Sequence, residues 1–270
     1  MKMTNRLSII IVTWNTAKIT CQAIDSIYKH LKDTSFEIIV VDNNSSDDTV
    51  DKISQIKKSH LSLTLIKNPK NYGFSKANNI GAKKAKGQYL FFLNSDTLLF
   101  DNSIKQSLDY LNQNSRQVGI IAPQLLNADK TPQASVFPPQ TILNAIKQFC
   151  FDQASQFTKY TPAGSGPVNA VSGAALIISQ KDFNKIGAWN EKYFFYFEDL
   201  DLCQKIRRLG KHVYYFKQAK IIHFHGQSSQ GPAKRQWKKL IPGSLTYHGP
   251  IKHYLLTTIL WLCQKIKKSR

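Results

Sequence analysis

Short apolar runs and amphipathic segments alternate along the first third of the chain. Four runs are rich in β-branched and aromatic residues and are too short for helices, so they predict buried strands at residues 7–13, 36–41, 61–66 and 88–93. Between the first two runs, Ile19, Ala23 and Ile27 recur at a spacing of four, which is typical of a helix with one apolar face. Further helices are predicted after Ser45, which can cap one of them, and at residues 75–86.

This order of elements predicts an α/β fold of the Rossmann-like type. Parallel strands need crossover connections, and helices provide these connections while covering both faces of the sheet. We therefore expect a mixed, mainly parallel sheet flanked by helices. The chain has 270 residues, of which 42% are hydrophobic, and this is enough to bury one sizeable core.

Polar clusters stand where three of the predicted strands end, at residues 13–15, 42–44 and 94–96. Ligands of such sheets bind beyond the carboxyl ends of the strands. The carboxylate of Asp42 can accept the N3–H of a uracil or thymine ring, or it can cap the following turn. The carboxylate of Asp96 can hold Mg²⁺ or Mn²⁺ together with substrate phosphates, although an ordinary turn aspartate shows the same pattern.

The middle of the chain has a different character. Residues 131–139 and 161–167 are rich in Pro, Gly and Ser, which predicts loops that frame a substrate-facing insertion. The strand pattern returns at residues 171–179. Beyond it we expect a helix at 199–209 and short strands at 212–216 and 221–225.

Two further clusters can carry chemistry. Five aromatic residues at 193–197 run directly into the carboxylates of Glu198, Asp199 and Asp201. Acidic residues favour helix N-termini through the macrodipole, but neighbouring aromatic rings would also desolvate a carboxylate and raise its pKa, as a general base requires. His223 and His225 place two imidazoles on the same side of a predicted strand, either as packed side chains or as functional groups.

The net charge of +20 is concentrated in one part of the chain. Asp201 is the last acidic residue, and residues 202–270 hold three quarters of the excess charge, 15 of 20. Such a block attracts a polyanion, which can be nucleic acid, an anionic membrane surface or a phosphorylated substrate. Residues 251–263 are largely apolar but too short to span a bilayer, which predicts either an interfacial amphipathic helix or a C-terminal helix packed on the domain.

The cysteines and the N-terminus indicate a reducing compartment. The cysteines stand at positions 21, 150, 203 and 263 and form no CxxC pair, so we expect free thiols rather than a zinc site or a disulfide framework. The apolar run at 7–12 is too short for the core of a signal peptide, and Trp14 follows where a small-residue cleavage site would be needed.

Seven segments of the sequence form a recognisable series. They are SIIIVTWN at 8–15, VDNNSS at 41–46, residues 68–81, FFLNSD at 91–96, residues 171–174, FEDLD at 197–201 and His223. In this order and spacing the chain resembles the family-2, GT-A-fold glycosyltransferases, and among them the bacterial rhamnosyltransferase-like branch. The resemblance implies a GT-A domain over residues 1–230 and leaves residues 231–270 as a basic amphipathic tail.

The resemblance implies roles for the matching positions. The catalytic base would be Asp199, with Glu198 beside it. The nucleoside-diphosphate sugar would be bound by Thr13, Asn15, Asp42, Lys76, Asn79 and Asp96. A divalent metal, Mg²⁺ or Mn²⁺, would be held by Asp96 and His223, and the acceptor would lie beside Trp189, Gly173 and Asp201. Asn94 stands where the family's DxD motif has its first Asp, so an oxygen ligand is kept while a charge is lost.

The implied reaction is an inverting sugar transfer to a hydroxyl of a lipid-linked or polysaccharide acceptor in cell-surface glycan synthesis. The favoured donor is dTDP-rhamnose, and a UDP-hexose remains open. The basic tail predicts a peripheral position at the cytoplasmic face of an anionic membrane. One alternative is a basic nucleic-acid-binding protein, but the carboxylates at the strand ends would repel its partner's phosphates. The other is a metal-dependent nucleotidyltransferase, which usually needs a glycine-rich loop near the first strand, and residues 13–20 contain no glycine.

Overall fold

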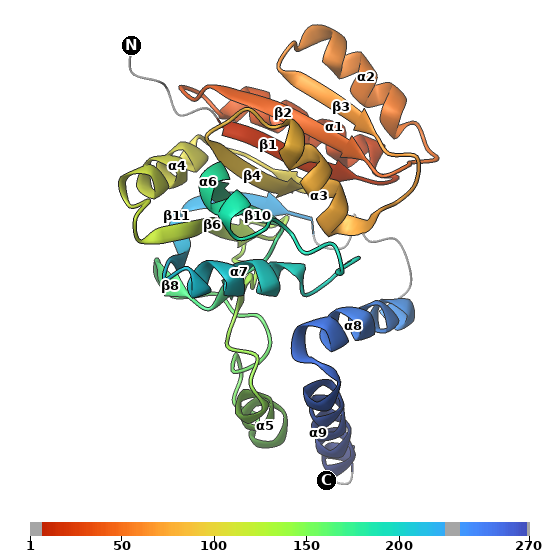
Figure 1. The fold of residues 1–270 in the computed structure, drawn as a ribbon, viewed down its shortest axis with the longest axis vertical. Coiled ribbons are helices and arrows are strands. Elements are labelled where there is room, and N and C mark those ends of the chain that lie inside the picture. Colours follow the sequence, from red (N-terminus) through yellow and green to blue (C-terminus); the bar gives the residue numbers. More distant parts are fainter. Residues whose placement is uncertain (1–6, 225–232, 269–270) are drawn as a thin grey trace.

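The computed structural model describes residues 7–224 and 233–268 (Figure 1). Its centre is a nine-stranded sheet. The strands in spatial order are β3 (Leu63–Lys67), β2 (Phe36–Asp42), β1 (Leu7–Thr13), β4 (Tyr89–Asn94), β10 (Ala175–Ser179), β6 (Val118–Leu126), β11 (His212–His223) and β5 (Thr97–Leu98), with β8 (Gly166–Val168) also paired to β11. β3, β2, β1 and β4 are parallel, whereas β10 runs antiparallel to both of its neighbours. The mixed α/β fold expected from the sequence is confirmed.

Helices cover both faces of this sheet (Figure 1). One face carries α1 (Ala17–His30), α2 (Thr49–Ser59) and α4 (Ser103–Gln113). The other face carries α3 (Gly73–Lys84), α6 (Gln180–Lys185) and α7 (Glu198–Arg208). Neighbouring residues of β1 enter opposite layers, because Ile9 packs in the first core and Ile10 in the second. Since both side chains are fully buried, β1 has a nearly continuous apolar sequence.

The last strand of the sheet differs from its prediction. The sequence predicts two short strands at 212–216 and 221–225, but β11 runs unbroken from His212 to His223. Its register against β6 shifts between Phe216 and Lys220, and this irregularity coincides with the polar interruption in the sequence. His225 lies outside the described residues.

Two other predictions need correction. The predicted strand at 171–179 is divided into β9 (Ala170–Val171) and β10, and β9 pairs instead with β7 (Val136–Phe137) inside a predicted loop. Ser45 does not cap the second helix, because α2 begins only after Asp48. The Ser45 side chain is used by the Asp42 carboxylate, to which it donates a hydrogen bond.

Outside the sheet and its helical layers stand α5 (Ile142–Phe151), α8 (Ala233–His248) and α9 (Pro250–Lys268) (Figure 1). α5 packs along α9, and a disulfide joins Cys150 to Cys263. The expectation that all the cysteines are free was therefore wrong: the bridged pair is separated by 113 residues, so spacing gave no sign that their helices meet. Cys21 and Cys203 are free. Within the described ranges, every helix is either too short or too polar to cross a bilayer.

Candidate active site

The carboxyl ends of β1, β2 and β4 border a pocket. Strand pairing places Thr13 opposite Asp42, and Val12 opposite Asn94, so the three polar clusters predicted from the sequence lie side by side. The pocket is lined by Val12, Thr13, Trp14, Asn43, Asn71, Gly73, Phe74, Asn94, Ser95, Phe194 and Phe195. It therefore brings together the strand ends, the start of α3 and the aromatic segment 193–197.

Hydrogen bonds tie the loop after β1 to the loop after β2. The side-chain oxygen of Asn15 accepts from the backbone N–H of Ser46 at 2.7 Å, and the backbone N–H of Asn15 donates to the Ser45 hydroxyl at 2.9 Å. The Asp42 carboxylate in turn accepts from the backbone N–H of Ser45 at 3.0 Å. Asp42 is thus buried and accepts a hydrogen bond within the turn that follows β2, as expected if its role is to cap that turn. Its contact with a nucleobase stays a prediction.

Asn43, to which the sequence analysis gave no role, holds the segment before α3. Its side-chain amide donates to the carbonyl of Gly73 at 3.2 Å. Gly73 has a φ of +78°, and a Cβ there would lie 2.5 Å from the Phe194 carbonyl oxygen, so only glycine fits. The backbone N–H of Phe74 donates to the same oxygen at 2.8 Å. These contacts fasten segment 193–197 along the edge of the pocket.

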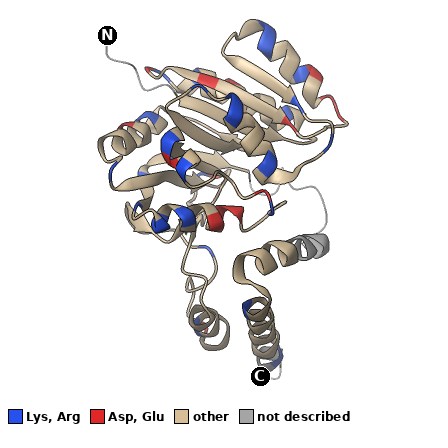
Figure 2. Ribbon diagram, in the orientation of Figure 1, with Lys and Arg blue, Asp and Glu red and all other residues tan. Residues whose placement is uncertain are grey.

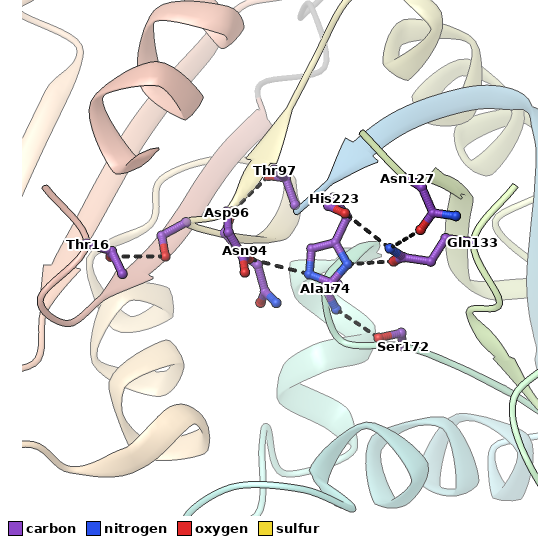
Figure 3. A network of polar contacts seen from close by, with 10 residues as sticks. Thr16, Asn94, Asp96, Thr97, Asn127, Gln133, Ser172, Ala174 and His223 are labelled. Atoms are coloured by element: carbon purple, nitrogen blue, oxygen red, sulfur yellow. Dashed lines mark hydrogen bonds and ion pairs between the residues drawn. The ribbon is translucent and has the colours of Figure 1, made fainter. Parts of the chain in front are cut away.

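Beyond the end of β4, Asp96 and His223 face one another (Figure 3). Both are buried, and His223 Nε2 lies 3.4 Å from Asp96 Oδ1. Gln133 fixes the imidazole: its Nε2 donates to Asn127 Oδ1 at 2.9 Å, which leaves its Oε1 to accept from His223 Nδ1 at 2.7 Å. In the neutral form of His223 the proton is therefore on Nδ1, and the Nε2 lone pair points toward the Asp96 carboxylate.

This arrangement fits a divalent cation. A carboxylate oxygen and an imidazole lone pair that face each other need a proton or a cation between them. A donor set of oxygen and nitrogen suits Mn²⁺ better than Mg²⁺, which prefers oxygen alone. Within residues 7–224 and 233–268, no group of three or more His, Cys, Asp or Glu side chains is placed to hold a metal, so Asp96 and His223 would need substrate phosphates and water as further ligands.

Glu198 and Asp199 open α7 directly after the aromatic segment. The Asp199 carboxylate accepts from the backbone N–H of Gly173 at 3.2 Å and from that of Leu200 at 2.9 Å. Burial raises the pKa of Asp199, while the nearby Lys159 ammonium and the two hydrogen bonds oppose this rise. Burial and the neighbouring Asp199 charge raise the pKa of Glu198 to about 8. The pair thus has the desolvated character that the aromatic cluster predicts.

The two halves of the site meet at the junction of β4 and β10. Asp199 is bonded to Gly173, and the carbonyl of the next residue, Ala174, accepts from the backbone N–H of Asn94 at 2.9 Å. Asn94 ends β4, and Asp96 follows it by two residues. The carboxylate pair of α7 and the Asp96–His223 pair therefore lie on either side of one junction, next to the pocket that Asn94 lines.

The turn before α7 is held from outside by α8. Tyr196 and Phe197 have φ values of +75° and +70°, a conformation that bulky residues adopt only when their surroundings enforce it. Gly243 of α8 lies against this turn, since a Cβ on it would be 2.6 Å from the Tyr196 carbonyl oxygen. The Tyr247 ring packs on the Phe197 ring with centroids 5.8 Å apart. The C-terminal helices thus contact the backbone that leads into the carboxylate pair.

Two of the predicted donor-binding residues lie on α3 and contact the segment before α7. Lys76 stands over the Tyr72 ring, 4.8 Å from its centroid, and is 3.8 Å from a carboxylate oxygen of Glu191. Its side chain is 45% exposed, and its contact with a diphosphate stays a prediction. The side chain of Asn79 bonds both backbone groups of Trp189, at 2.9 and 3.1 Å. In this structure Asn79 positions that segment.

The remaining predicted residues are engaged in local contacts. Trp189 is 1% exposed, so its ring belongs to the core and does not present a surface to an acceptor. The Thr13 hydroxyl lies 2.8 Å from that of Thr20 and anchors the start of α1. Asp201 pairs with Lys205 at 3.0 Å. The acceptor contact expected of Trp189 is therefore wrong, whereas the substrate contacts expected of Thr13 and Asp201 remain predictions.

Gln133, Lys159 and Gly243 belong to the site although no motif predicts them. Gln133 and Lys159 come from the middle region, where composition indicated only loops facing a substrate. Gly243 comes from the tail, where charge and apolarity were the only signals. Each acts through a residue that is distant in sequence, so a local pattern could not reveal its role.

A pocket at the carboxyl ends of the strands of an α/β sheet is where such folds bind nucleotides and related ligands. The sequence profile of glycosyl transferase family 2 matches residues 8–153, more than half of the chain. The protein belongs to this family.

Relatives of known name cover much of the chain. The low-salt glycan biosynthesis hexosyltransferase Agl10 of Haloferax volcanii is 28% identical over 219 residues, which is 76% of this chain and 63% of the relative. The dTDP-rhamnosyl transferase RfbF of Shigella flexneri is 25% identical over 256 residues, 93% of this chain and 77% of the relative. The chain thus spans less than two thirds of the Haloferax protein.

Solved structures confirm the GT-A fold. GalNAc-T7 with UDP, GalNAc and Mn²⁺ matches 89% of this chain and 48% of its own, with a TM-score of 0.65 and 16% identity. The mannosyltransferase PcManGT from Pyrobaculum calidifontis, in complex with GDP-Man and Mn²⁺, matches 97% of this chain and 70% of its own, with a TM-score of 0.63 and 16% identity. At 16% identity these similarities are evidence for a shared fold alone.

Proposed function

We propose that this protein transfers a sugar from a nucleoside-diphosphate sugar to a hydroxyl group, with inversion at the anomeric carbon. The observation that carries the proposal is the partly buried Asp199 carboxylate, which Gly173 and Leu200 hold beside the pocket at the strand ends. A desolvated carboxylate with a raised pKa suits a general base. Burial and the neighbouring Asp199 charge raise the pKa of Glu198 to about 8, so Glu198 is largely protonated at neutral pH.

The proposed reaction is a single displacement. Asp199 takes the proton of the acceptor hydroxyl while the acceptor oxygen forms a bond to the anomeric carbon. The bond from that carbon to the diphosphate oxygen breaks on the opposite face of the sugar, and the diphosphate leaves with the electron pair. Because attack and departure occur on opposite faces, the configuration is inverted.

The leaving diphosphate would lie beside Asp96, His223 and Lys76. Asp96 and His223 would hold Mn²⁺ or Mg²⁺, and such a cation when bound supplies electrostatic stabilisation of the diphosphate charge. Gln133 keeps His223 Nε2 available by holding Nδ1. Lys76 adds a positive charge from the rim of the site. Since Asn94 contributes an amide in place of a second carboxylate, we expect weaker metal binding than a DxD motif would give.

The nucleoside of the donor would lie against Thr13, Asn15 and Asp42, with Asn79 near the diphosphate. A thymidine or uridine diphosphate suits Asp42, because both rings offer an N3–H to a carboxylate. We favour dTDP-rhamnose and place a UDP-hexose second. The names of the Shigella and Haloferax relatives, a dTDP-rhamnosyl transferase and a hexosyltransferase, support this order.

The acceptor would be a lipid-linked or polysaccharide hydroxyl in cell-surface glycan synthesis, bound on the side of Gly173 and Asp201. We place the protein at the cytoplasmic face of the membrane, with residues 1–230 as the catalytic domain and 231–270 as the part that meets the lipid. The absence of acidic residues after Asp201 supports this placement. A nucleic-acid partner is disfavoured, because the carboxylates at the strand ends would repel phosphates.

Melting temperatures with dTDP, UDP, GDP and CDP, each with and without Mn²⁺, test this function. A ligand present at about 100 times its dissociation constant stabilises a protein by about 2.7 kcal/mol. We expect dTDP or UDP to give such a shift and Mn²⁺ to enlarge it. The Asp199→Asn variant is the matched control and should keep the shift, because the base acts on the acceptor. If none of the four nucleotides stabilises the protein, the proposal is refuted.

A further inference from the structure

Helix α9 exposes its apolar side. The residues that face the rest of the protein are His253, Leu256 and Cys263, which are 9%, 4% and 4% exposed. Large apolar side chains stand on the opposite side and are 46% to 78% exposed, namely Ile251, Tyr254, Leu255, Trp261 and Leu262. At about 100° per residue these five occupy an arc of about 120°, which also holds the exposed Thr258, so they lie together on one side of the helix and are here called the α9 stripe. Soluble monomers rarely expose this many large apolar side chains together without a partner.

The α9 stripe is presented on a fixed support. α9 packs along α5, where the Cys150–Cys263 pair joins the two helices, and His253 Nδ1 lies 2.8 Å from the Ser244 hydroxyl of α8. In a reducing compartment the two thiols would still lie side by side, and the packing of Leu256 would remain. The stripe therefore has a defined direction relative to the catalytic domain.

The charges around the stripe indicate what covers it. α8 and α9 contain no Asp or Glu, and Figure 2 shows basic residues along α9. Lys265 stands 4.0 Å over the Trp261 ring, so a cation borders the apolar surface directly. A second copy of this chain would bring its own net charge of +20 against the first, and like charges oppose such a dimer. Apolar residues bordered by cations instead complement an anionic lipid surface.

We propose that the α9 stripe docks into the interfacial region of an anionic bilayer, with α9 lying along the membrane surface. The five side chains of the stripe enter the boundary between headgroups and acyl chains, and Lys265 stays among the lipid phosphates. α8 connects this surface to the turn before α7, so docking places the pocket near the bilayer. This inference deepens the proposed function. It rests on that function for one point only, namely that docking would bring a lipid-linked acceptor within reach of the site.

Flotation of the full-length protein with vesicles tests the docking surface. The vesicles are phosphatidylcholine alone or an equimolar mixture with phosphatidylglycerol, at low salt. We expect wild type to float with the anionic vesicles, and the Leu255→Ser/Leu262→Ser variant to partition at least about tenfold more weakly, because two exposed leucines lose their apolar burial in the lipid. Leu61→Ser is the matched control: this residue is 103% exposed before β3, away from α9, and its change should leave flotation unaltered.

Tryptophan fluorescence gives a second readout in the intact protein. The emission of Trp261 should shift to shorter wavelength when anionic vesicles are added, and Trp261→Phe should remove this shift while keeping flotation. Equal flotation of the Leu255→Ser/Leu262→Ser variant and wild type would overturn the proposal. It would also be overturned if wild type were a dimer that binds no vesicles and the variant were a monomer, because the stripe would then be a dimer interface. Flotation contains no nucleotide and the melting assay contains no vesicles, so the failure of docking is distinguishable from the failure of sugar transfer.

Discussion

Replacing Gly243 with alanine adds one methyl group where α8 meets the turn before α7. The added Cβ would lie 2.6 Å from the Tyr196 carbonyl oxygen, so the turn or the helix must move by at least about 0.4 Å to reach a normal contact. Alanine gains about 1 kcal/mol of helix propensity over glycine, while overpacking costs about 1–3 kcal/mol. We therefore expect the free energy of unfolding to fall by no more than about 2 kcal/mol.

The larger effect of Gly243→Ala is expected on catalysis. The displaced turn leads directly into Asp199, and a misplacement of about 1 Å lowers the rate of a reaction by about 10²-fold. A shift of about 0.4 Å should thus lower kcat about tenfold and leave the KM of the donor unchanged, because the donor is bound at the strand ends. A small loss of stability together with a large loss of turnover would distinguish a positioning role of Gly243 from simple destabilisation of the fold.

The assay for Gly243→Ala measures the initial rate of nucleoside-diphosphate release at saturating acceptor, with the donor whose nucleotide stabilises the protein. Gly164→Ala is the matched control, because a Cβ at that glycine meets nothing within 4 Å. If kcat of Gly243→Ala lies within about twofold of Gly164→Ala, α8 yields to the methyl group and does not hold the turn. The argument from the contact distances would then be refuted.

Three other variants test the electrostatics of the site. The Lys159 charge lowers the pKa of both carboxylates of the pair, so Lys159→Gln should move the acidic limb of the kcat–pH profile to higher pH. The pKa of Glu198 is raised from 4.5 to about 8, so its contribution to stability is fully present below pH 4.5 and is lost as the pH rises to about 8. Glu198→Gln should remove this loss, as melting temperatures across about pH 4 to 9 would reveal. Gln133→Leu frees the His223 ring, so the half-saturating Mn²⁺ concentration should rise about 10- to 100-fold in titrations followed by nucleotide binding. An unchanged profile, melting curve or titration would contradict the corresponding role.

The parts of the fold that the sequence predicts best depend on local pattern. β1, β2 and β4 are short apolar runs with polar residues at their carboxyl ends, and parallel pairing must bring such ends to one edge of the sheet. For this reason Asp42 and Asn94 could be placed near one another without coordinates. The aromatic segment before Glu198 likewise indicated a desolvated carboxylate, and the raised pKa values of Glu198 and Asp199 agree with it.

The parts that the sequence could not predict depend on contacts between distant residues. His223 is oriented by Gln133, 90 residues earlier, and nothing in the loop around Gln133 marks it as a partner. Cys150 and Cys263 meet only because α5 packs along α9. The predicted division of β11 falls where its pairing with β6 shifts register, between Phe216 and Lys220, but the strand itself continues through this bulge to His223.

The most direct test of the central claim is the turnover of Asp199→Asn. Asparagine keeps the size of the side chain but cannot take the acceptor proton, and loss of a general base typically lowers the rate by about 10²–10⁴-fold. We predict a fall in kcat of at least about 10²-fold, with the affinity for the nucleoside diphosphate unchanged within about twofold. Turnover close to that of wild type would show that Asp199 is not the base and would contradict the account.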